Sequence, residues 1–330
     1  MARLAAVSQP VVSYVLSGDD QAPVAPATRQ RVLDAIAELG YVPDHTARSL
    51  RSRRTFTIAG AIPDITNPFY PAFERGIQDV ASAAGYDLLV FNTDGAREME
   101  QKFLASARSG RVDGIIVRFF QVSLHDCLPL VRGGVPVVAL TSEPPPPGDA
   151  PIDTVAIDGA AAAKAATAYL IGKGHRRIAM LAGEPGSRAN MRRTLGYEEA
   201  LREAGLALDT DQVRTSDFTE GGGFAATSEL LNLPERPTAI FATNDLLALG
   251  ALSSLKQAGL RVPDDVAIVG FDNQEIIAAH LHPGLTTVEL PHYAMGKWAV
   301  EYLLAHLGEE YPLPPVQHMI GCPLVERASA

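Results

Sequence analysis

The sequence predicts an α/β protein in which a small helical headpiece precedes a two-lobed body built on parallel β-sheets. From residue 56 onward, short apolar runs alternate with amphipathic stretches, and this alternation is typical of parallel strands whose two faces are covered by helices. The alternation occurs twice, once on either side of a proline run at 144–147. With 330 residues, of which 47% are apolar, the chain is long enough for two or three domains with their own cores.

The sequence of residues 1–44 predicts the short helices of a helix-turn-helix headpiece. Ser8 before Gln9 and Pro10 is a typical helix start, because proline is tolerated in the first helical turn. The apolar face of this first segment is formed by Val11, Val12, Val15 and Leu16. A later helix is predicted from Ala27 to Leu39, followed by Gly40 as a suitable end. Its apolar residues at helical spacing are Val32, Leu33, Ile36 and Leu39.

Charge is distributed unevenly along the chain. The whole sequence has 28 basic and 38 acidic side chains, for a net charge of -10, whereas the first 55 residues have seven basic and five acidic side chains. Four of the seven basic residues are clustered, at Arg48, Arg51, Arg53 and Arg54. Such a cluster is either a solvated linker or a contact to nucleic-acid phosphates, and the residues alone leave both interpretations open.

The body predicts two sets of alternating strands and helices. The predicted strands cover 57–62, 86–91, 114–117, 135–140, 178–181, 239–242 and 266–270. The predicted helices cover 73–84, 99–109, 160–172, 194–204 and a stretch that ends at Ala258. Two such sets in one chain predict two lobes with a cleft between the carboxyl ends of their strands.

Polar pairs follow two of the predicted strands. Asn244 and Asp245 come after one strand, and Asp272 and Asn273 come after the next. In parallel α/β lobes, residues at the carboxyl ends of strands face the ligand cleft. Capping of the following helix explains Asn244 and Asp245 equally well.

Several classes of protein are not supported by the sequence. Cys127 and Cys322 stand far apart, so neither a disulfide framework nor a thiolate zinc site is expected. The loosely spaced His280, His282 and His292 do not form a metal-binding motif, and no cofactor is expected. Phosphate-binding, hydrolase and dinucleotide motifs are also missing, so an enzyme is not expected. No secretory signal or membrane span is visible, which favours the cytoplasm.

The chain resembles the lactose-repressor (LacI/GalR) family of transcriptional regulators over essentially its full length. Each motif that carries the resemblance is weak, but their order and spacing together are highly specific. They comprise Ala5 to Pro10 with Val12 and Ser13, Thr28 to Pro43, Ala47 to Arg51, Ile62 to Tyr70, Gly174 to Ile178, Ala242 to Asp245, Val269 to Asp272, and Leu285 to Val288.

The resemblance implies a regulator made of a DNA-binding headpiece, a hinge and a sensor similar to periplasmic sugar-binding proteins. The expected domains are the headpiece at 1–44, a hinge helix at 45–55, an N-terminal sensor lobe at 56–154 with 285–313, and a C-terminal lobe at 155–284 with 314–330. A homodimer would place two recognition helices in successive major grooves of a palindromic operator. The hinge leucine, here Leu50, would insert into the minor groove, and effector binding would reorder the hinge.

The family's DNA contacts carry over to residues in the headpiece and hinge, with several departures. The expected DNA-binding residues are Ser8, Gln9, Pro10, Ser13, Tyr14, Arg29, Arg48, Leu50 and Arg51. Val11 stands where the family commonly has threonine, and Tyr14 where it commonly has arginine, so fewer DNA contacts are expected. Asp44 adds a negative charge beside the hinge. The family's first helix usually begins before the position of Met1, so this helix is expected to be truncated as written.

The resemblance also implies an effector pocket in the sensor. Its expected ligand-binding residues are Asn67, Phe69, Tyr70, Arg118, Arg193, Phe218, Asn244 and Asp272. Core packing is an alternative role for Phe69 and Phe218. Arg118 and Arg193 together would favour an anionic ligand if Asp272 balances only one of them. Alternatively, Arg118 points to solvent or pairs with a surface acid.

The sequence therefore predicts a ligand-responsive transcriptional regulator, most simply a repressor of an operon for the use of a sugar or sugar acid. Its expected partners are palindromic operator DNA, a sugar-like effector and a second copy of the chain, with no membrane partner. The alternative is a two-lobed solute-binding receptor without DNA-binding activity, which would lack the headpiece.

Overall fold

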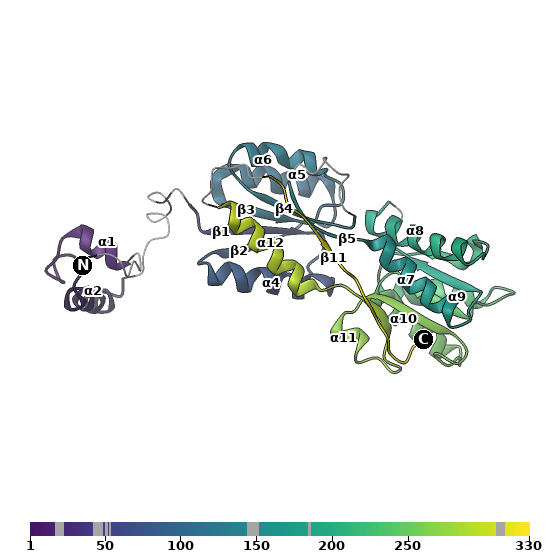
Figure 1. Ribbon diagram of the computed structural model, residues 1–330. Helices are drawn as coiled ribbons and strands as arrows, with labels where there is room; N and C mark the ends of the chain where they lie inside the picture. The colour runs from purple at the N-terminus through teal and green to yellow at the C-terminus, as the bar shows by residue number, and fades with distance from the viewer. Residues whose placement is uncertain are drawn as a thin grey trace. The chain divides into compact units, whose positions relative to one another are not determined.

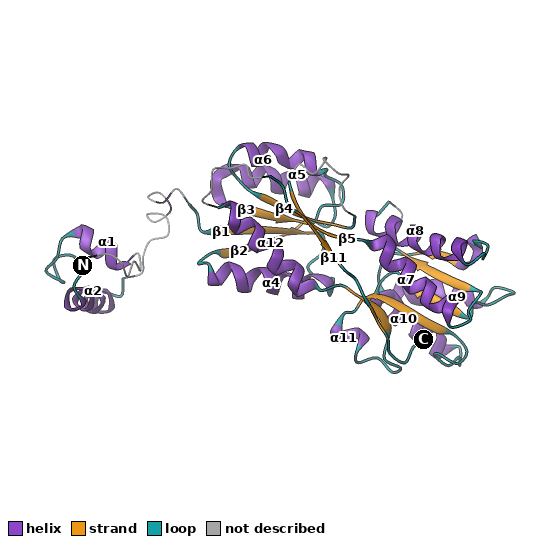
Figure 2. Ribbon diagram, viewed as in Figure 1, coloured by secondary structure: helices purple, strands orange, loops and turns teal. Residues whose placement is uncertain are grey.

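The structure is a computed structural model that describes residues 1–16, 23–41, 49, 52, 54–143, 152–183, 186–307 and 314–330. The chain forms two compact units, Met1–Phe56 and Thr57–Ala330 (Figure 1). In its described residues the smaller unit contains helices and turns, whereas the larger unit contains two β-sheets with helices on their faces (Figure 2).

The smaller unit is built around two helices, α1 (Gln9–Leu16) and α2 (Pro26–Leu39). A short turn precedes α1, in which the Ala5 amide donates to the Met1 carbonyl over 3.0 Å. The helices and this turn share a small core of Ala5, Val12, Val15, Val32 and Ala35. The predicted apolar face of α2 is wrong at Leu33 and Leu39, which are 44% and 53% exposed, because the buried stripe follows the positions of Val32 and Ala35 instead.

Gly40 ends α2 as the sequence predicts. Its backbone is left-handed, with φ of 55°, a conformation that suits glycine because it has no Cβ. The predicted hinge helix falls mostly on residues outside the described ranges, including Arg48, Leu50 and Arg51. That element therefore stays a prediction.

The N-terminal lobe of the larger unit contains a six-stranded parallel sheet in the order β11-β5-β4-β3-β1-β2. Its strands are β1 (Thr57–Ile62), β2 (Asp87–Asn92), β3 (Gly114–Val117), β4 (Val137–Thr141), β5 (Asp153–Ile157) and β11 (Gln317–Ile320). The central strands are continuous apolar runs because both faces of the sheet are covered.

The C-terminal lobe repeats this plan with the order β12-β10-β9-β8-β6-β7. Its strands are β6 (Ile178–Ala182), β7 (Val213–Thr215), β8 (Ala239–Ala242), β9 (Ala267–Asp272), β10 (Thr286–Glu289) and β12 (Leu324–Val325). Every pairing is parallel except that of β10 with β12. The two lobes therefore present the carboxyl ends of parallel strands to the space between them.

Helices cover both faces of each sheet (Figure 1). The N-terminal lobe contains α4 (Phe69–Ala83), α5 (Arg97–Ser106), α6 (Leu128–Arg132) and α12 (His292–His306), with short helices at Ala107–Arg111 and Leu124–Cys127. The C-terminal lobe contains α7 (Gly159–Gly172), α8 (Arg188–Glu203), α9 (Glu220–Leu231), α10 (Asp245–Gln257) and α11 (Glu275–Ala278), with a short helix at Thr210–Gln212. Paired helices pack very closely. A Cβ on Gly76 of α4, for example, would collide with the carbonyl oxygen of Tyr293 on α12.

The chain crosses between the lobes three times, and this corrects the predicted lobe boundaries. The crossings follow β5, β10 and β11. The boundary at 154 is wrong because β5 runs to Ile157 in the N-terminal sheet. The assignments of 285–313 and 314–330 are wrong at two strands, since β10 pairs with β9 in the C-terminal lobe and β11 pairs with β5 in the N-terminal lobe. Strand periodicity reveals that a strand exists, but not which sheet edge accepts it.

Candidate functional site

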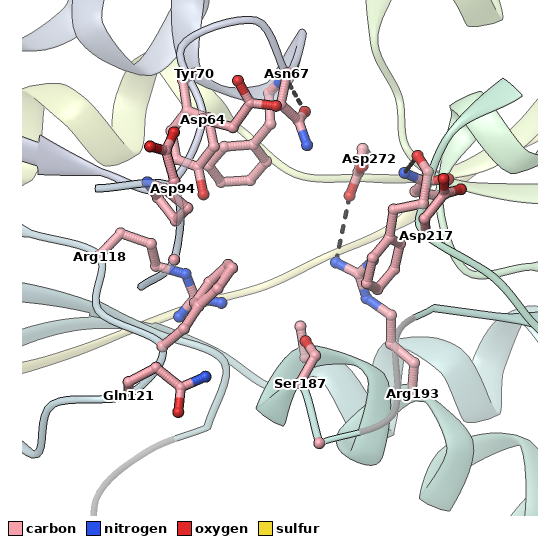
Figure 3. A pocket seen from close by; sticks show the side chains of 18 residues that line it. Asp64, Asn67, Tyr70, Asp94, Arg118, Gln121, Ser187, Arg193, Asp217 and Asp272 are labelled. Atoms are coloured by element: carbon pink, nitrogen blue, oxygen red, sulfur yellow. Dashed lines mark hydrogen bonds and ion pairs between the residues drawn. The ribbon is translucent and has the colours of Figure 1, made fainter. Parts of the chain in front are cut away.

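A cavity of about 750 Å³ lies between the two lobes of the larger unit, in the size range of small-molecule sites (Figure 3). All eight predicted ligand-binding residues line it, namely Asn67, Phe69, Tyr70, Arg118, Arg193, Phe218, Asn244 and Asp272. The other lining residues are Pro63, Asp64, Asp94, Gly95, Phe120, Gln121, Gly186, Ser187, Ala189 and Asp217. The geometry brings the predicted residues together, and their contact with a ligand remains a prediction.

The topology explains why residues so far apart in sequence meet here. In the N-terminal lobe, Asn67 follows β1 and Arg118 follows β3. In the C-terminal lobe, Phe218 follows β7, Asn244 follows β8, and Asp272 is the last residue of β9. Because the carboxyl ends of parallel strands share one edge of a sheet, each lobe contributes one wall of the cleft.

Arg193 and Asp272 form a buried ion pair in the C-terminal wall. The Arg193 Nη2 atom lies 3.3 Å from Asp272 Oδ1, and the two side chains are 8% and 6% exposed. Arg193 also donates to the Thr243 carbonyl and lies 3.9 Å from the ring centre of Phe271. Burial raises the pKa of Asp272 to about 6, and the charge of Arg193 opposes that rise. This pair is therefore neutral as a whole and fixed in position before any ligand arrives.

Arg118 occupies the opposite wall with different partners. Its Nη1 donates to the Leu140 carbonyl over 3.1 Å, and its Nη2 donates to the Ser142 hydroxyl over 2.6 Å. The guanidinium also interacts with the buried Tyr70 hydroxyl, and its centre lies 5.5 Å from that of the Phe120 ring. Arg118 thus lines the cleft. The alternative left open by the sequence, in which Arg118 points to solvent or pairs with a surface acid, is wrong.

Aromatic side chains form apolar parts of both walls. Phe69 packs edge to face against Tyr70 at 4.8 Å and against His292 at 4.4 Å between ring centres. Phe218 packs on Gly183, where a Cβ would overlap its ring. Both phenylalanines are half-buried and also border the cavity. Each therefore packs against its neighbours and lines the cavity at the same time. Burial, with a smaller effect of the charge of Arg193, lowers the pKa of His292 to about 4.

Asn244 and Asp245 show that helix capping and cleft lining are compatible. The Asn244 Oδ1 atom accepts the Leu247 amide over 2.8 Å at the start of α10, while its Nδ2 donates to the Phe218 carbonyl over 3.1 Å. Asn244 therefore caps the helix and fixes the loop that carries Phe218. Asp245 is fully buried behind the cavity and accepts bonds from the Gln274 amide over 2.7 Å and the Thr287 hydroxyl over 2.6 Å.

Sequence reasoning missed three acidic side chains at the cavity. Asp64, Asp94 and Asp217 are exposed and line it from both lobes. Each belongs to a loop that follows a strand, namely β1, β2 and β7. The rule that identified Asn244, a polar residue just beyond the carboxyl end of a strand, would have found them too.

Glu100 is a second residue that the sequence did not single out. It is fully buried in α5 and accepts the backbone amides of Phe120, Gln121 and Val122 over 2.7, 3.0 and 2.7 Å. Phe120 and Gln121 line the cavity, so this carboxylate positions part of the N-terminal wall. A glutamate on a polar helix gave no signal for this role in the sequence.

The headpiece residues predicted to bind DNA lie on and beside α1 and α2. Ser8, Gln9, Pro10 and Tyr14 are exposed, and Ser13 and Arg29 are half-buried. Val12 and Val15 face inward to the core. The exposed side of α1 is consequently polar at its amino end, where the recognition helices of DNA-binding proteins contact base edges.

The remaining candidates for special chemistry are dispersed. His280 and His282 are exposed near the end of the C-terminal lobe, whereas His292 is buried in the first turn of α12. Within the described ranges, no three histidine, cysteine or carboxylate side chains are placed to hold a metal ion. Both cysteines are free thiols. No helix among the residues that the structure describes is long and apolar enough to cross a membrane.

Two family models match the chain. Residues 1–44 match the model of bacterial regulatory proteins of the lacI family, and residues 167–330 match that of the periplasmic binding protein-like domain. The first match covers the unit that contains α1 and α2. The second covers strands and helices of the C-terminal lobe and the last elements of the N-terminal lobe.

Curated relatives match along nearly the whole chain. Catabolite control protein A of Priestia megaterium is 37% identical over 313 residues, which are 94% of this chain and 92% of that protein. The ribose operon repressor of Escherichia coli strain K12 is 35% identical over 331 residues, covering 100% and 98%.

Solved structures agree with the sequence matches. The complex of the transcriptional regulator CelR with cellobiose is 35% identical, with a TM-score of 0.73 and coverage of 100% of this chain and 98% of that one. The lac repressor dimer bound to operator and an anti-inducer is 26% identical, with a TM-score of 0.86 and coverage of 99% and 97%. The chain therefore belongs to the lacI family of bacterial regulatory proteins and is a DNA-binding transcriptional regulator.

Proposed function

We propose that this protein represses transcription by binding a palindromic operator as a homodimer, under the control of a small effector in the cleft between its lobes. The observation that carries the proposal is the cavity, lined by residues of both lobes, in a chain whose residues 1–44 match the lacI family model and present the exposed amino end of α1. Relatives support it, because one is named a ribose operon repressor and another was solved as a dimer on its operator.

In the proposed complex, the amino end of α1 enters the major groove. Ser8, Gln9 and Pro10 reach the groove first, and Ser13 and Tyr14 follow along the helix. Arg29, in the first turn of α2, contacts phosphate. Two copies related by a two-fold axis place two such helices one helical turn of DNA apart, which requires a palindromic site.

The hinge completes the proposed DNA contact. Arg48 and Arg51 neutralise phosphates, and Leu50 inserts between base pairs in the minor groove. An effector that closes the lobes shifts the hinge between its ordered and disordered forms, and so changes operator affinity. This regulation takes place in the cytoplasm, where the chromosome lies, and involves no catalytic step.

The cleft suits a sugar or sugar derivative. Phe69 and Phe218 offer flat apolar faces, while Asn67, Asn244 and Asp272 add polar groups at the same cavity. Sugars present both hydroxyls and apolar ring faces, so they match such a mixture of walls. Two structures of similar regulators, solved with cellobiose and with ribose, support this class of effector.

A fluorescence anisotropy titration tests the proposal. The probe is the DNA upstream of this gene and its neighbours, compared with a scrambled duplex of the same composition. Binding should be specific and should weaken roughly 10³-fold or more between 50 and 200 mM salt if six to ten phosphates are contacted. Gln9→Ala should reduce specific binding, whereas Gln30→Ala on α2, where Gln30 donates to Asp34, is the matched control. Equal affinity for the palindromic and scrambled duplexes would contradict the proposal.

A further inference from the structure

We propose that the effector of this regulator carries a carboxylate or phosphate group, and that this group binds the guanidinium of Arg118. The inference rests on the proposed function, because it names the chemical class of ligand for the same cleft.

The arginines around the cavity differ in how their charge is balanced. Arg193 lies 3.3 Å from the carboxylate of Asp272. Arg188 and Arg192 lie 3.7 and 3.5 Å from the carboxylate of Glu143. Arg118, in contrast, makes its hydrogen bonds to the Leu140 carbonyl and the Ser142 hydroxyl, which are both neutral. Among the described residues, no carboxylate lies within ion-pair distance of Arg118.

An anion bound at Arg118 would balance a charge that has no carboxylate partner among the described residues. Arg118 is half-buried in the wall of the cavity, and burial of a charge without a counter-ion is unfavourable. Its guanidinium remains protonated at any physiological pH. The positive charges of Arg193 and Arg188 add to that of Arg118, which increases the gain from a bound anion.

Arg118 also retains donors for such a ligand. A guanidinium has five N–H groups. The bonds to Leu140 and Ser142 occupy two of them and the Tyr70 hydroxyl a third, so two remain. The Tyr70 hydroxyl is a neighbour on the same side of the cavity. Carboxylate and phosphate match the fork of a guanidinium through two parallel bonds, so both chemistries fit the remaining donors.

Three exposed carboxylates at the cavity, Asp64, Asp94 and Asp217, bear on the chemistry of the ligand. Asp64 and Asp217 accept bonds from their own loops, namely from the hydroxyl and amide groups of Thr66 and Thr219. Asp94 accepts a bond from the Asn92 side chain. These exposed carboxylates repel a bound anionic group and accept bonds from hydroxyls. Figure 3 shows Asp64 and Asp94 on the same side of the cavity as Arg118, and Asp217 on the opposite side. The ligand is therefore a sugar acid or sugar phosphate whose anionic group binds Arg118 and whose hydroxyls bind the carboxylates.

Isothermal titration of the full chain tests the inference with three probes: inorganic phosphate, D-glucuronate and neutral D-glucose. Wild-type protein should bind at least one anionic probe more tightly than D-glucose. Arg118→Gln should weaken that binding roughly 10- to 150-fold, the effect of losing one charge-assisted bond. Preference for phosphate or for glucuronate distinguishes the two sources of the anion.

Two further variants control for charge and folding. Arg188→Gln removes the same charge from an arginine whose side chain is 68% exposed, and it should change the affinity less than threefold. Arg118→Lys keeps the charge without the fork, and its affinity should lie between those of wild type and Arg118→Gln. If Arg118→Gln fails to fold, the anion affinity of Arg118→Lys relative to wild type still tests the role of Arg118.

Three results would overturn the inference: D-glucose binding at least as tightly as either anion, no saturable anion binding at tens of millimolar, or equal losses in Arg118→Gln and Arg188→Gln. Operator affinity of the same preparations separates this outcome from failure of the proposed function. Specific operator binding without anion binding disproves only the charge of the effector. Anion binding at Arg118 without operator binding disproves the repressor function and leaves the site in place.

Discussion

The two lobes each use one buried carboxylate to hold the loop that lines their wall of the cleft, but the two carboxylates are held differently. Glu100 in the N-terminal lobe accepts three backbone amides from 120–122. Asp245 in the C-terminal lobe accepts the Gln274 amide and the Thr287 hydroxyl and also interacts with the Phe271 backbone. Asp245 also lies near a second buried carboxylate, Asp272, whose charge acts on it.

Because of this difference, we expect the stability of the C-terminal wall to depend on pH through Asp245. Burial, followed by the charge of Asp272, raises the pKa of Asp245 to about 8. Both causes favour the protonated form of Asp245 in the folded protein. Glu100 instead gathers three amide dipoles around one carboxyl group. One wall is thus held by a carboxylate that three amides surround, and the other by a carboxyl group whose protonated form is favoured by burial and by a neighbouring carboxylate.

The largest expected effect follows from Glu100→Gln. The variant directs an amide N–H₂ group at backbone amides that the carboxylate now satisfies, so at least one buried donor loses its acceptor. We expect a loss of about 3 kcal/mol in the free energy of unfolding, measured by urea denaturation. Glu98→Gln, an exposed change on the same helix, is the control and should cost less than about 0.5 kcal/mol. A loss below about 1 kcal/mol for Glu100→Gln would show that the loop does not depend on the carboxylate.

A smaller and pH-dependent effect is expected for Asp245→Asn. The folded pKa of Asp245 is raised above its ordinary value, so its stabilisation is complete at acidic pH and is lost as pH rises toward about 8. Across that window, this residue should lower the free energy of unfolding by up to about 1.4 kcal/mol per pH unit. The asparagine variant should remove this slope and should cost about 1 to 2 kcal/mol at pH 5.5. Because wild type loses up to about 3.5 kcal/mol between pH 5.5 and 8, the variant should be at least as stable as wild type at pH 8.

Urea denaturation at several pH values between 5 and 8.5 measures this slope. Asp87→Asn, an exposed change at the start of β2, shows the effect of losing one surface carboxylate. A slope that is the same in wild type and in Asp245→Asn would mean that another group controls the pH dependence of the fold.

The smallest expected effect is that of Thr287→Val. This change removes the hydroxyl that donates to Asp245 and should cost about 1 kcal/mol in the free energy of unfolding. Because that bond lowers the pKa of Asp245, its loss should also extend the pH-dependent window to higher pH. Thr227→Val is a matched control in the same lobe, since the buried Thr227 hydroxyl has no hydrogen-bond partner. An equal loss of unfolding free energy in Thr287→Val and Thr227→Val would mean that the bond from Thr287 to Asp245 does not stabilise the fold.

The central strands could be predicted from the sequence because their burial on both faces leaves a continuous apolar run. The strand predicted at 57–62 and the one predicted at 239–242 are confirmed by β1 and β8 with the same bounds. The interior strand β5 was nevertheless missed, because its first two residues are polar and shorten its apolar run. β5 begins with Asp153, which is buried because it meets His306 and accepts the Val316 amide, and neither partner is near it in sequence.

Helix α9 was missed because local propensity and tertiary packing disagree there. The helix begins with Glu220 and three glycines, which are poor helix formers. The third of these glycines, Gly223, is needed because α9 and α10 approach closely. A Cβ on Gly223 would collide with Leu247, and one on Gly250 would collide with Glu220. Contacts between the two helices therefore decide a structure that the residues of α9 alone disfavour.

Some residues of the candidate site could likewise be predicted from the sequence, and others could not. Asn244 and Asp272 could be found from their places at strand ends, whereas Arg193 was identified only through the family resemblance. The burial of Glu100 could not be predicted, because it depends on a loop 20 residues later in the chain folding back over α5. Residues that bind distant backbone reveal their role only once the fold is known.

The three crossings between the lobes have a consequence for the order in which the protein is made. The N-terminal sheet receives its edge strand only with Gln317–Ile320, and the C-terminal sheet only with Leu324–Val325. Ser329 then binds both the Thr286 and the Ile268 amides, each over 2.8 Å. The core of the headpiece, by contrast, lies within the first 36 residues. During synthesis on the ribosome, the headpiece therefore has all the residues of its core early. The two sensor lobes are complete only when almost the last codons have been translated.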